Sequence, residues 1–232
     1  MSIIKLVNLK KIYRIGEEKI ESLKGINLEL EEGKIYCILG TSGSGKTTLL
    51  NMMAGLERAS AGEIYIKDAP LHRMSEKELT IFRKKNVGFV FQSYNLMENM
   101  TALENVTLPL IFQKKSKKIR VKESAKILKE VGLSDRLHHK PTQLSGGQQQ
   151  RVGIARAFVN NPHIIFADEP TGNLDTKTSE EMMELFVRLV KEHNQTLIMV
   201  THDTYTSTYA DSIINIKDGE ITSITKNANK HD

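Results

Sequence analysis

One segment of the chain constrains its fold more than any other. It reads Gly-Thr-Ser-Gly-Ser-Gly-Lys-Thr over residues 40–47, and it follows a short, β-branched apolar run at 34–39. Such a run predicts a buried strand of a parallel sheet, and the helical spacing of residues 47–56 predicts a helix directly after the loop. A glycine-rich turn between strand and helix directs successive backbone N–H groups at an anion. The segment therefore predicts a phosphate-binding loop in an α/β protein.

The residue types of this loop match the chemistry of a bound nucleotide. The glycines let the backbone bend, Lys46 can reach the terminal phosphates, and Thr47 offers its hydroxyl to Mg²⁺. We expect nucleotide contacts from the whole loop and from the residue that follows it: Gly40, Thr41, Ser42, Gly43, Ser44, Gly45, Lys46, Thr47 and Thr48.

A second pattern places two adjacent carboxylates at the end of an apolar run. Residues 164–167 read as a buried strand, and Asp168 and Glu169 follow it directly. Such a pair, taken alone, is more often a solvated strand end. In a chain with a phosphate loop, Asp168 is placed to hold Mg²⁺ and Glu169 to polarise the attacking water. We therefore predict an enzyme that hydrolyses a nucleoside triphosphate.

A second glycine turn opens another predicted helix about a hundred residues after the first. Residues 144–151 read Leu-Ser-Gly-Gly-Gln-Gln-Gln-Arg. Ser145 could simply be the N-cap of a helix. Both interpretations can hold, because a capped helix N-terminus also attracts anions. A nucleotide touched by both glycine turns would need two protein surfaces.

The rest of the pattern predicts how these segments are connected. Early apolar alternation indicates antiparallel strands, Ser75 and Glu78 form a capping box, and 93–156 is mostly helical. Alternation of strands and helices then resumes. We predict one α/β domain with a parallel sheet, an antiparallel β subdomain and a helical insertion. Its predicted parts are a catalytic core at 1–92 and 157–225, a helical subdomain at 93–156 and a polar tail at 226–232.

Composition and hydropathy indicate where the protein is located in the cell. No apolar run approaches the roughly 18 to 20 residues that cross a bilayer, and no export signal opens the sequence, so we expect a cytoplasmic protein. The single cysteine, Cys37, lies in the strand-like run and is interpreted as a small buried apolar group. The net charge of +5 comes largely from one run of lysines and arginine at 114–122, a pattern typical of a solvated helix face.

The phosphate loop, the 144–148 segment and the Asp168–Glu169 pair, in this order, resemble the ATP-binding subunits of ABC transporters over nearly the whole chain. The resemblance implies an ABC-type P-loop core, with ATP and Mg²⁺ as cofactors. It implies that Tyr13 stacks on adenine, Gln92 contacts Mg²⁺ and the attacking water, and His202 contacts the γ-phosphate. It further implies that Asp175 lies at a dimer contact, that the metal is held by Thr47, Gln92 and Asp168, and that the other protomer's nucleotide is contacted by Ser145, Gly146, Gly147 and Gln148.

The resemblance also implies partners. Two copies would form a head-to-tail homodimer around two ATP molecules and drive a separately encoded membrane permease from the inner face of the membrane. The segments 90–96, 100–106 and 170–175 resemble the macrolide-efflux, lipoprotein-release and antimicrobial-peptide-export subgroup, so a drug, peptide or lipoprotein is the expected cargo.

Two alternatives remain open. One is an ABC ATPase of a non-transport membrane machine, such as a regulator of cell-wall hydrolases. The other is an ABC ATPase acting on DNA or ribosomes, which the basic charge weakly allows. The chain has one cassette and no long coiled-coil insertion, so nucleic acid is not expected as a partner. His138 and His139 have no metal-ligand partner at useful spacing and are interpreted as surface residues.

Overall fold

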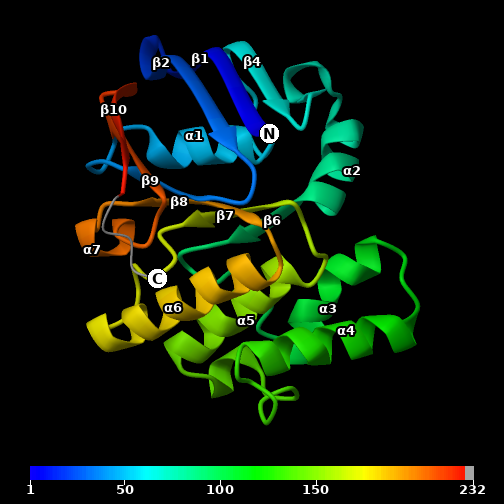
Figure 1. The fold of residues 1–232 in the computed structure, drawn as a ribbon. Helices are drawn as coiled ribbons and strands as arrows, with labels where there is room; N and C mark the ends of the chain where they lie inside the picture. The colour runs from blue at the N-terminus through cyan, green and yellow to red at the C-terminus, as the bar shows by residue number, and fades with distance from the viewer. Residues whose placement is uncertain (228–232) are drawn as a thin grey trace. The chain divides into compact units, whose positions relative to one another are not determined.

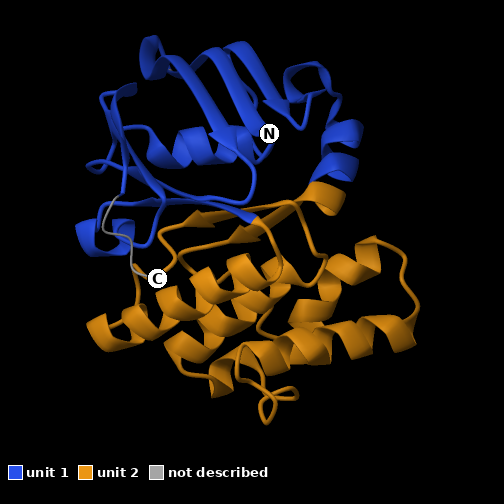
Figure 2. Ribbon diagram, in the orientation of Figure 1, with its two compact units in different colours: residues 1–83, 196–232 blue, residues 84–195 orange. Residues whose placement is uncertain are grey.

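The computed structural model describes residues 1–227 of the 232-residue chain. It contains two compact units, residues 1–83 with 196–232 (unit 1) and residues 84–195 (unit 2), coloured blue and orange in Figure 2. Each unit combines helices with strands, as Figure 1 shows element by element. The predicted α/β class is confirmed. The predicted division into a catalytic core and a helical subdomain stays a prediction.

Unit 1 contains the predicted antiparallel strands. The sheet order is β2-β1-β4-β5, and alternate side chains of β2, such as Leu28 and Leu30, are buried on one face. The elements of this part are β1 (Ser2–Ile15), β2 (Glu18–Glu31), β4 (Ala61–Ile66), β5 (Ala69–Pro70), the 3-10 turn η1 (Leu71–Arg73) and α2 (Glu76–Asn86), in which the chain passes to unit 2.

The predicted buried strand is β3 (Ile35–Leu39), whose neighbours β8 and β9 run parallel to it. Residues 35–38 are buried, which explains the continuous apolar run. In the register of β3 and β8, Leu39 lies opposite Thr201. The segments that follow these two residues therefore leave the same edge of the sheet. The other elements are α1 (Lys46–Met53), β8 (Thr196–Thr201), α7 (Thr204–Ser207), β9 (Ser212–Lys217) and β10 (Glu220–Lys226).

Unit 2 packs helices around a parallel pair of strands. Val90 of β6 lies opposite Ala167 of β7, and the rings of Phe158 and Phe186 meet edge to face at 5.8 Å between centroids. The elements are β6 (Val87–Val90), α3 (Ala102–Phe112), α4 (Lys117–Glu130), η2 (Pro141–Gln143), α5 (Gly146–Phe158), β7 (Ile164–Asp168) and α6 (Thr176–Glu192).

Several predicted boundaries differ from the observed ones. Helix α1 ends at Met53 instead of 56, because Gly55 adopts a left-handed φ of +67°. Lys226 was expected in the polar tail but ends strand β10, and Asn227 donates to the carbonyl of Thr208 at 2.8 Å. The remainder of that predicted tail, 228–232, lies outside the described residues. Within 1–227, no helix combines the length and apolarity needed to cross a membrane.

The buried position of Cys37 generates a first prediction. Burial raises the pKa of its thiol to about 12, and the negative charge of Asp203 acts in the same direction. The thiolate is the reactive form, so the native protein should react with iodoacetamide at pH 8 far more slowly than the urea-unfolded chain. Mass spectrometry of both states measures the difference. Equal labelling rates would show that Cys37 is reached without unfolding.

Candidate functional site

The phosphate loop folds as a tight turn in unit 1 between β3 and α1. Gly43 and Gly45 adopt φ values of +79° and +99°, which L residues rarely do. A Cβ on Gly45 would lie 2.7 Å from the carbonyl oxygen of Ser22, and one on Gly40 would lie 2.4 Å from that of Ile216. Gly43 has open space around it. Backbone packing therefore requires glycine at 40 and 45, while 43 faces outward.

The polar groups of this loop fit a bound phosphate group. No side chain caps the first turn of α1, and this turn contains no acidic residue. The Oγ of Ser44 is buried without a hydrogen-bond partner. Lys46 is only 6% exposed, and its ammonium donates to the carbonyl of Thr41 at 2.8 Å. A buried cation, an unsatisfied hydroxyl and an uncapped helix N-terminus together form an anion site.

Two other predicted residues of unit 1 lie beside the loop or at its sheet edge. The hydroxyl of Tyr13 lies 3.4 Å from Oγ1 of Thr48, which also accepts from Ser22 at 3.2 Å. The ammonium of Lys11 lies 4.9 Å from the centre of the Tyr13 ring, so one ring face is already covered. His202 directly follows β8, at the same sheet edge as Gly40.

Unit 2 brings Gln92 and Glu169 together. The amide nitrogen of Gln92 donates to a carboxylate oxygen of Glu169 at 3.4 Å. Glu169 has a left-handed φ of +43° and begins a turn closed by Gly172. A Cβ on Gly172 would lie 2.9 Å from that amide nitrogen. Asp168 is the last residue of β7, so both predicted carboxylates stand where the strand ends.

The second glycine turn is a capped helix start, as the alternative interpretation predicted. Ser145 accepts from the backbone of Gln148 at 3.3 Å, and Gln148 accepts from the backbone of Ser145 at 3.0 Å. Asp175 caps α6 through Thr178, and these hydrogen bonds lower the pKa of its carboxyl. A Cβ on Gly147 would lie 2.8 Å from the methyl group of Thr178. The starts of α5 and α6 therefore lie in contact within unit 2.

The sequence interpretation missed the residues that hold the Gln92 loop. Arg156 of α5 donates to the carbonyls of Tyr94 at 2.8 Å and Asn95 at 2.6 Å, both residues with left-handed backbone. Asn173 donates to the carbonyl of Gln92 at 2.9 Å. The chain separations of 61 and 81 residues leave no local signal for these bonds.

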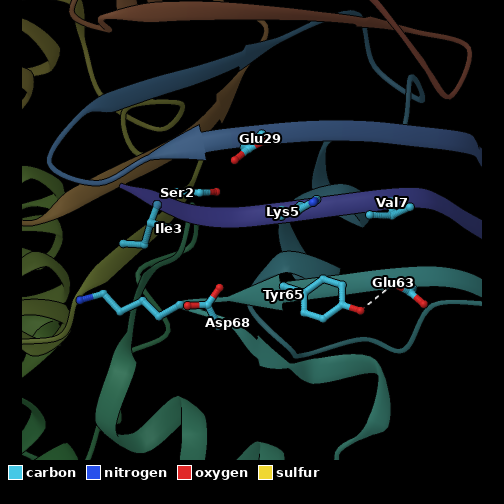
Figure 3. A pocket seen from close by; sticks show the side chains of 9 residues that line it. Ser2, Ile3, Lys5, Val7, Glu29, Glu63, Tyr65 and Asp68 are labelled. Atoms are coloured by element: carbon cyan, nitrogen blue, oxygen red, sulfur yellow. Dashed lines mark hydrogen bonds between the residues drawn. The ribbon is translucent and has the colours of Figure 1, made fainter.

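A separate hollow of about 370 Å³ lies in unit 1 against the strands β1, β2 and β4 (Figure 3). Its walls include Lys5, Glu29 and Tyr65, and the Tyr65 hydroxyl donates to Glu63 at 2.6 Å. None of the predicted nucleotide residues lines it. Its charged side chains are of both signs and do not point to one place, unlike the polar groups of the phosphate loop.

Comparison with known proteins agrees with this geometry. The protein family described as ABC transporter matches residues 23–172. An uncharacterized ABC transporter ATP-binding protein of Methanocaldococcus jannaschii, MJ1508, is 52% identical over 221 residues, covering 95% of this chain and 98% of the relative. The macrolide export ATP-binding/permease protein MacB of Rhodopirellula baltica is 44% identical, covering 93% of this chain but 32% of the relative.

A solved structure is similar as well. It is the dimeric post-hydrolysis state of the ATP-binding cassette MJ0796 bound to ADP and Pi, with a TM-score of 0.90, 46% identity and coverage of 97% of this chain and 98% of that one. The chain thus belongs to the ABC transporter family, in which it is an ATP-binding and ATP-hydrolysing subunit.

The hydrogen bonds of Arg156 generate a second prediction. An Arg156→Lys variant cannot make the two-pronged contact with Tyr94 and Asn95, and it should lose about 1 to 3 kcal/mol of stability. Because the Gln92 loop is then less well held, kcat for ATP should fall more than KM rises. Steady-state kinetics and thermal unfolding measure the two effects.

Arg188→Lys is the matched control, because Arg188 donates to a single carbonyl, that of Glu130, at 3.1 Å on an exposed surface. Its kinetics should be unchanged. Equal losses in both variants would mean that Arg156 has no special relation to the loop.

Proposed function

We propose that the chain is the motor subunit of an exporter and acts as a head-to-tail dimer beneath a separate permease. The observation that supports an ATP-driven motor most directly is the anion site at the start of α1, with Ser44 and Lys46 buried in it, and the similar dimeric cassette MJ0796 supports the dimer. In this proposal each loop binds the phosphates of one ATP, and Ser145 and Gly147 of the opposite protomer complete the site.

The proposed chemistry is attack of water on the γ-phosphate. Glu169 accepts the proton of the attacking water, and the 3.4 Å contact with Gln92 orients its carboxylate. His202 contacts the γ-phosphate from the end of β8. Tyr13 stacks on adenine through the ring face that Lys11 leaves uncovered.

Mg²⁺ belongs to this proposal. Thr47 and Asp168 would hold it with Gln92, and the ion would neutralise charge on the phosphates. Among the described residues, no cluster of three or more His, Cys, Asp or Glu side chains is placed to bind a metal. Such a site would therefore depend on oxygens of the nucleotide, as is common for Mg²⁺.

The exported cargo is proposed to be a drug, a peptide or a lipoprotein. The support is the similarity to MacB, whose name joins macrolide export, ATP binding and a permease in one protein. In this proposal the permease is a second polypeptide, as the name of MJ1508, an ATP-binding protein matched over 98% of its length, suggests, and this subunit is held on the inner face of the membrane through it. A non-transport membrane machine that regulates cell-wall hydrolases is the alternative.

A Glu169→Gln variant tests the catalytic assignment. It should bind ATP normally, hydrolyse it at least about a hundredfold more slowly, and accumulate as a dimer, because the general base is lost while the binding groups remain. Phosphate release and size-exclusion chromatography in Mg-ATP are the measurements. Glu184→Gln, which changes an exposed residue of α6, is the control and should behave as wild type. Normal turnover in Glu169→Gln would remove Glu169 from its role, and a monomer in saturating Mg-ATP would contradict the sandwich dimer.

The partner is tested by tagging the Glu169→Gln protein and extracting it from native membranes in Mg-ATP and mild detergent. We expect a membrane permease to copurify, because the trapped state keeps its partner longest. Recovery of a permease together with a cell-wall hydrolase would favour the alternative machine. Recovery of soluble proteins or nucleic acid alone would contradict the transport function.

A further inference from the structure

The positive charge of the chain is concentrated at one place. Six cations lie between residues 114 and 122, and the nearest acidic residues along the chain are Glu104 and Glu123. The net charge of the chain is +5, so everything outside these six carries +5 − 6 = −1. The basic character is therefore a local feature and not a general property of the surface.

These cations form no salt bridge in the part of the chain that the structure describes. None of the six takes part in an ion pair with a carboxylate there. Lys114, Lys117, Lys118 and Lys122 are exposed, and the Nε of Arg120 is buried without a partner. Three of the six lie in the first turn of α4, where positive charge opposes the helix dipole, and Ser116 makes no capping bond there. The arrangement opposes the dipole of α4 without an ion pair among the described residues to offset it.

Exposed apolar side chains lie among the cations. Phe112 is 66% exposed, and Ile111, Ile119 and Val121 are 43%, 47% and 41% exposed. They belong to the end of α3 and the start of α4, joined by the short connection at the right-hand edge of the ribbon in Figure 1. We call residues 111–122 the hairpin end. A hollow of about 260 Å³ between the two helices is lined by Met100, Leu103, Leu108 and Ile111, with the charged residues Glu104, Lys117 and Arg120 also in its wall.

We infer that the hairpin end binds the anionic surface of a lipid bilayer. Lysines attract acidic headgroups, while an exposed phenylalanine and aliphatic side chains gain free energy by entering the boundary between headgroups and acyl chains. A nucleic-acid site would use the cations but leave the four apolar side chains in water. The mixture of the two kinds of side chain is what favours a membrane. The inference does not depend on the permease or on the proposed cargo.

The test is flotation of the purified full-length chain with vesicles. We expect binding to vesicles of phosphatidylcholine with 30% phosphatidylglycerol, little binding to pure phosphatidylcholine, and weakening by salt. The double variant Lys117→Gln/Lys118→Gln should bind the anionic vesicles about 25-fold more weakly, at roughly fivefold for each lysine. Phe112→Ser should also weaken binding. All variants should keep wild-type ATPase activity, which shows that they are folded.

Matched controls separate a specific surface from general attraction. Lys24→Gln/Lys217→Gln removes the same charge from exposed sites elsewhere, and Ile224→Ser removes another side chain that is 55% exposed. Both should bind vesicles as wild type does. Equal weakening in the hairpin and control variants would overturn the inference, as would the absence of binding to anionic vesicles. Binding only to vesicles that contain the permease, or only to nucleic acid, would overturn it in favour of those partners.

Discussion

The attraction that an uncapped helix N-terminus exerts on an anion is the interaction around which the loop of unit 1 is built. Every other feature of the loop makes room for it or strengthens it. Gly45 lets β2 approach so closely that a Cβ would lie 2.9 Å from the side chain of Leu23, and Gly40 does the same against β9. The buried ammonium of Lys46, turned to a loop carbonyl, has a donor geometry that an anion can take over. The buried hydroxyl of Ser44 has no hydrogen-bond partner, which costs free energy that a bound phosphate group would recover.

In unit 2, side chains from distant parts of the sequence hold the unusual backbone around Gln92 and Glu169 in place. Glu169, Tyr94 and Asn95 all adopt left-handed backbone, which costs about 1 to 3 kcal/mol at each residue. Such conformations persist only where the surroundings hold them. Here the guanidinium of Arg156 binds two consecutive carbonyls, the amide of Asn173 binds a third, and the missing side chain of Gly172 leaves space for the Gln92 amide. The carboxylate of Glu169, the proposed general base, is thus positioned through residues that hold the Gln92 loop.

Much of the fold and of the candidate site could be predicted from the sequence. The features that could not be predicted have physical reasons. The strands around the phosphate loop, the capping box at Ser75 and the burial of Cys37 follow from short-range patterns, and the structure confirms them. The Arg156 contacts do not, because no periodicity links residues 61 positions apart. Nor could the sequence show whether the charges of the hairpin end stand alone in solvent or beside exposed apolar side chains. The exposure of Phe112 and its neighbours decides this, because helical periodicity alone would equally allow these side chains to lie in the core.

Helix α3 relates the hairpin end to the Gln92 loop. Its eleven residues span about 16 Å, and the buried side chain of Asn105 binds the backbone of Met97, Met100 and Thr101 at its start. At its other end, the chain turns directly into the cationic start of α4. The hydrogen bonds of Asn105 hold the segment after Gln92 against the first turns of α3. A surface that fixes the orientation of the hairpin end would therefore also limit the orientation of the Gln92 loop. Contact with a bilayer would then restrict the orientations in which the Gln92 loop meets a permease before any nucleotide binds.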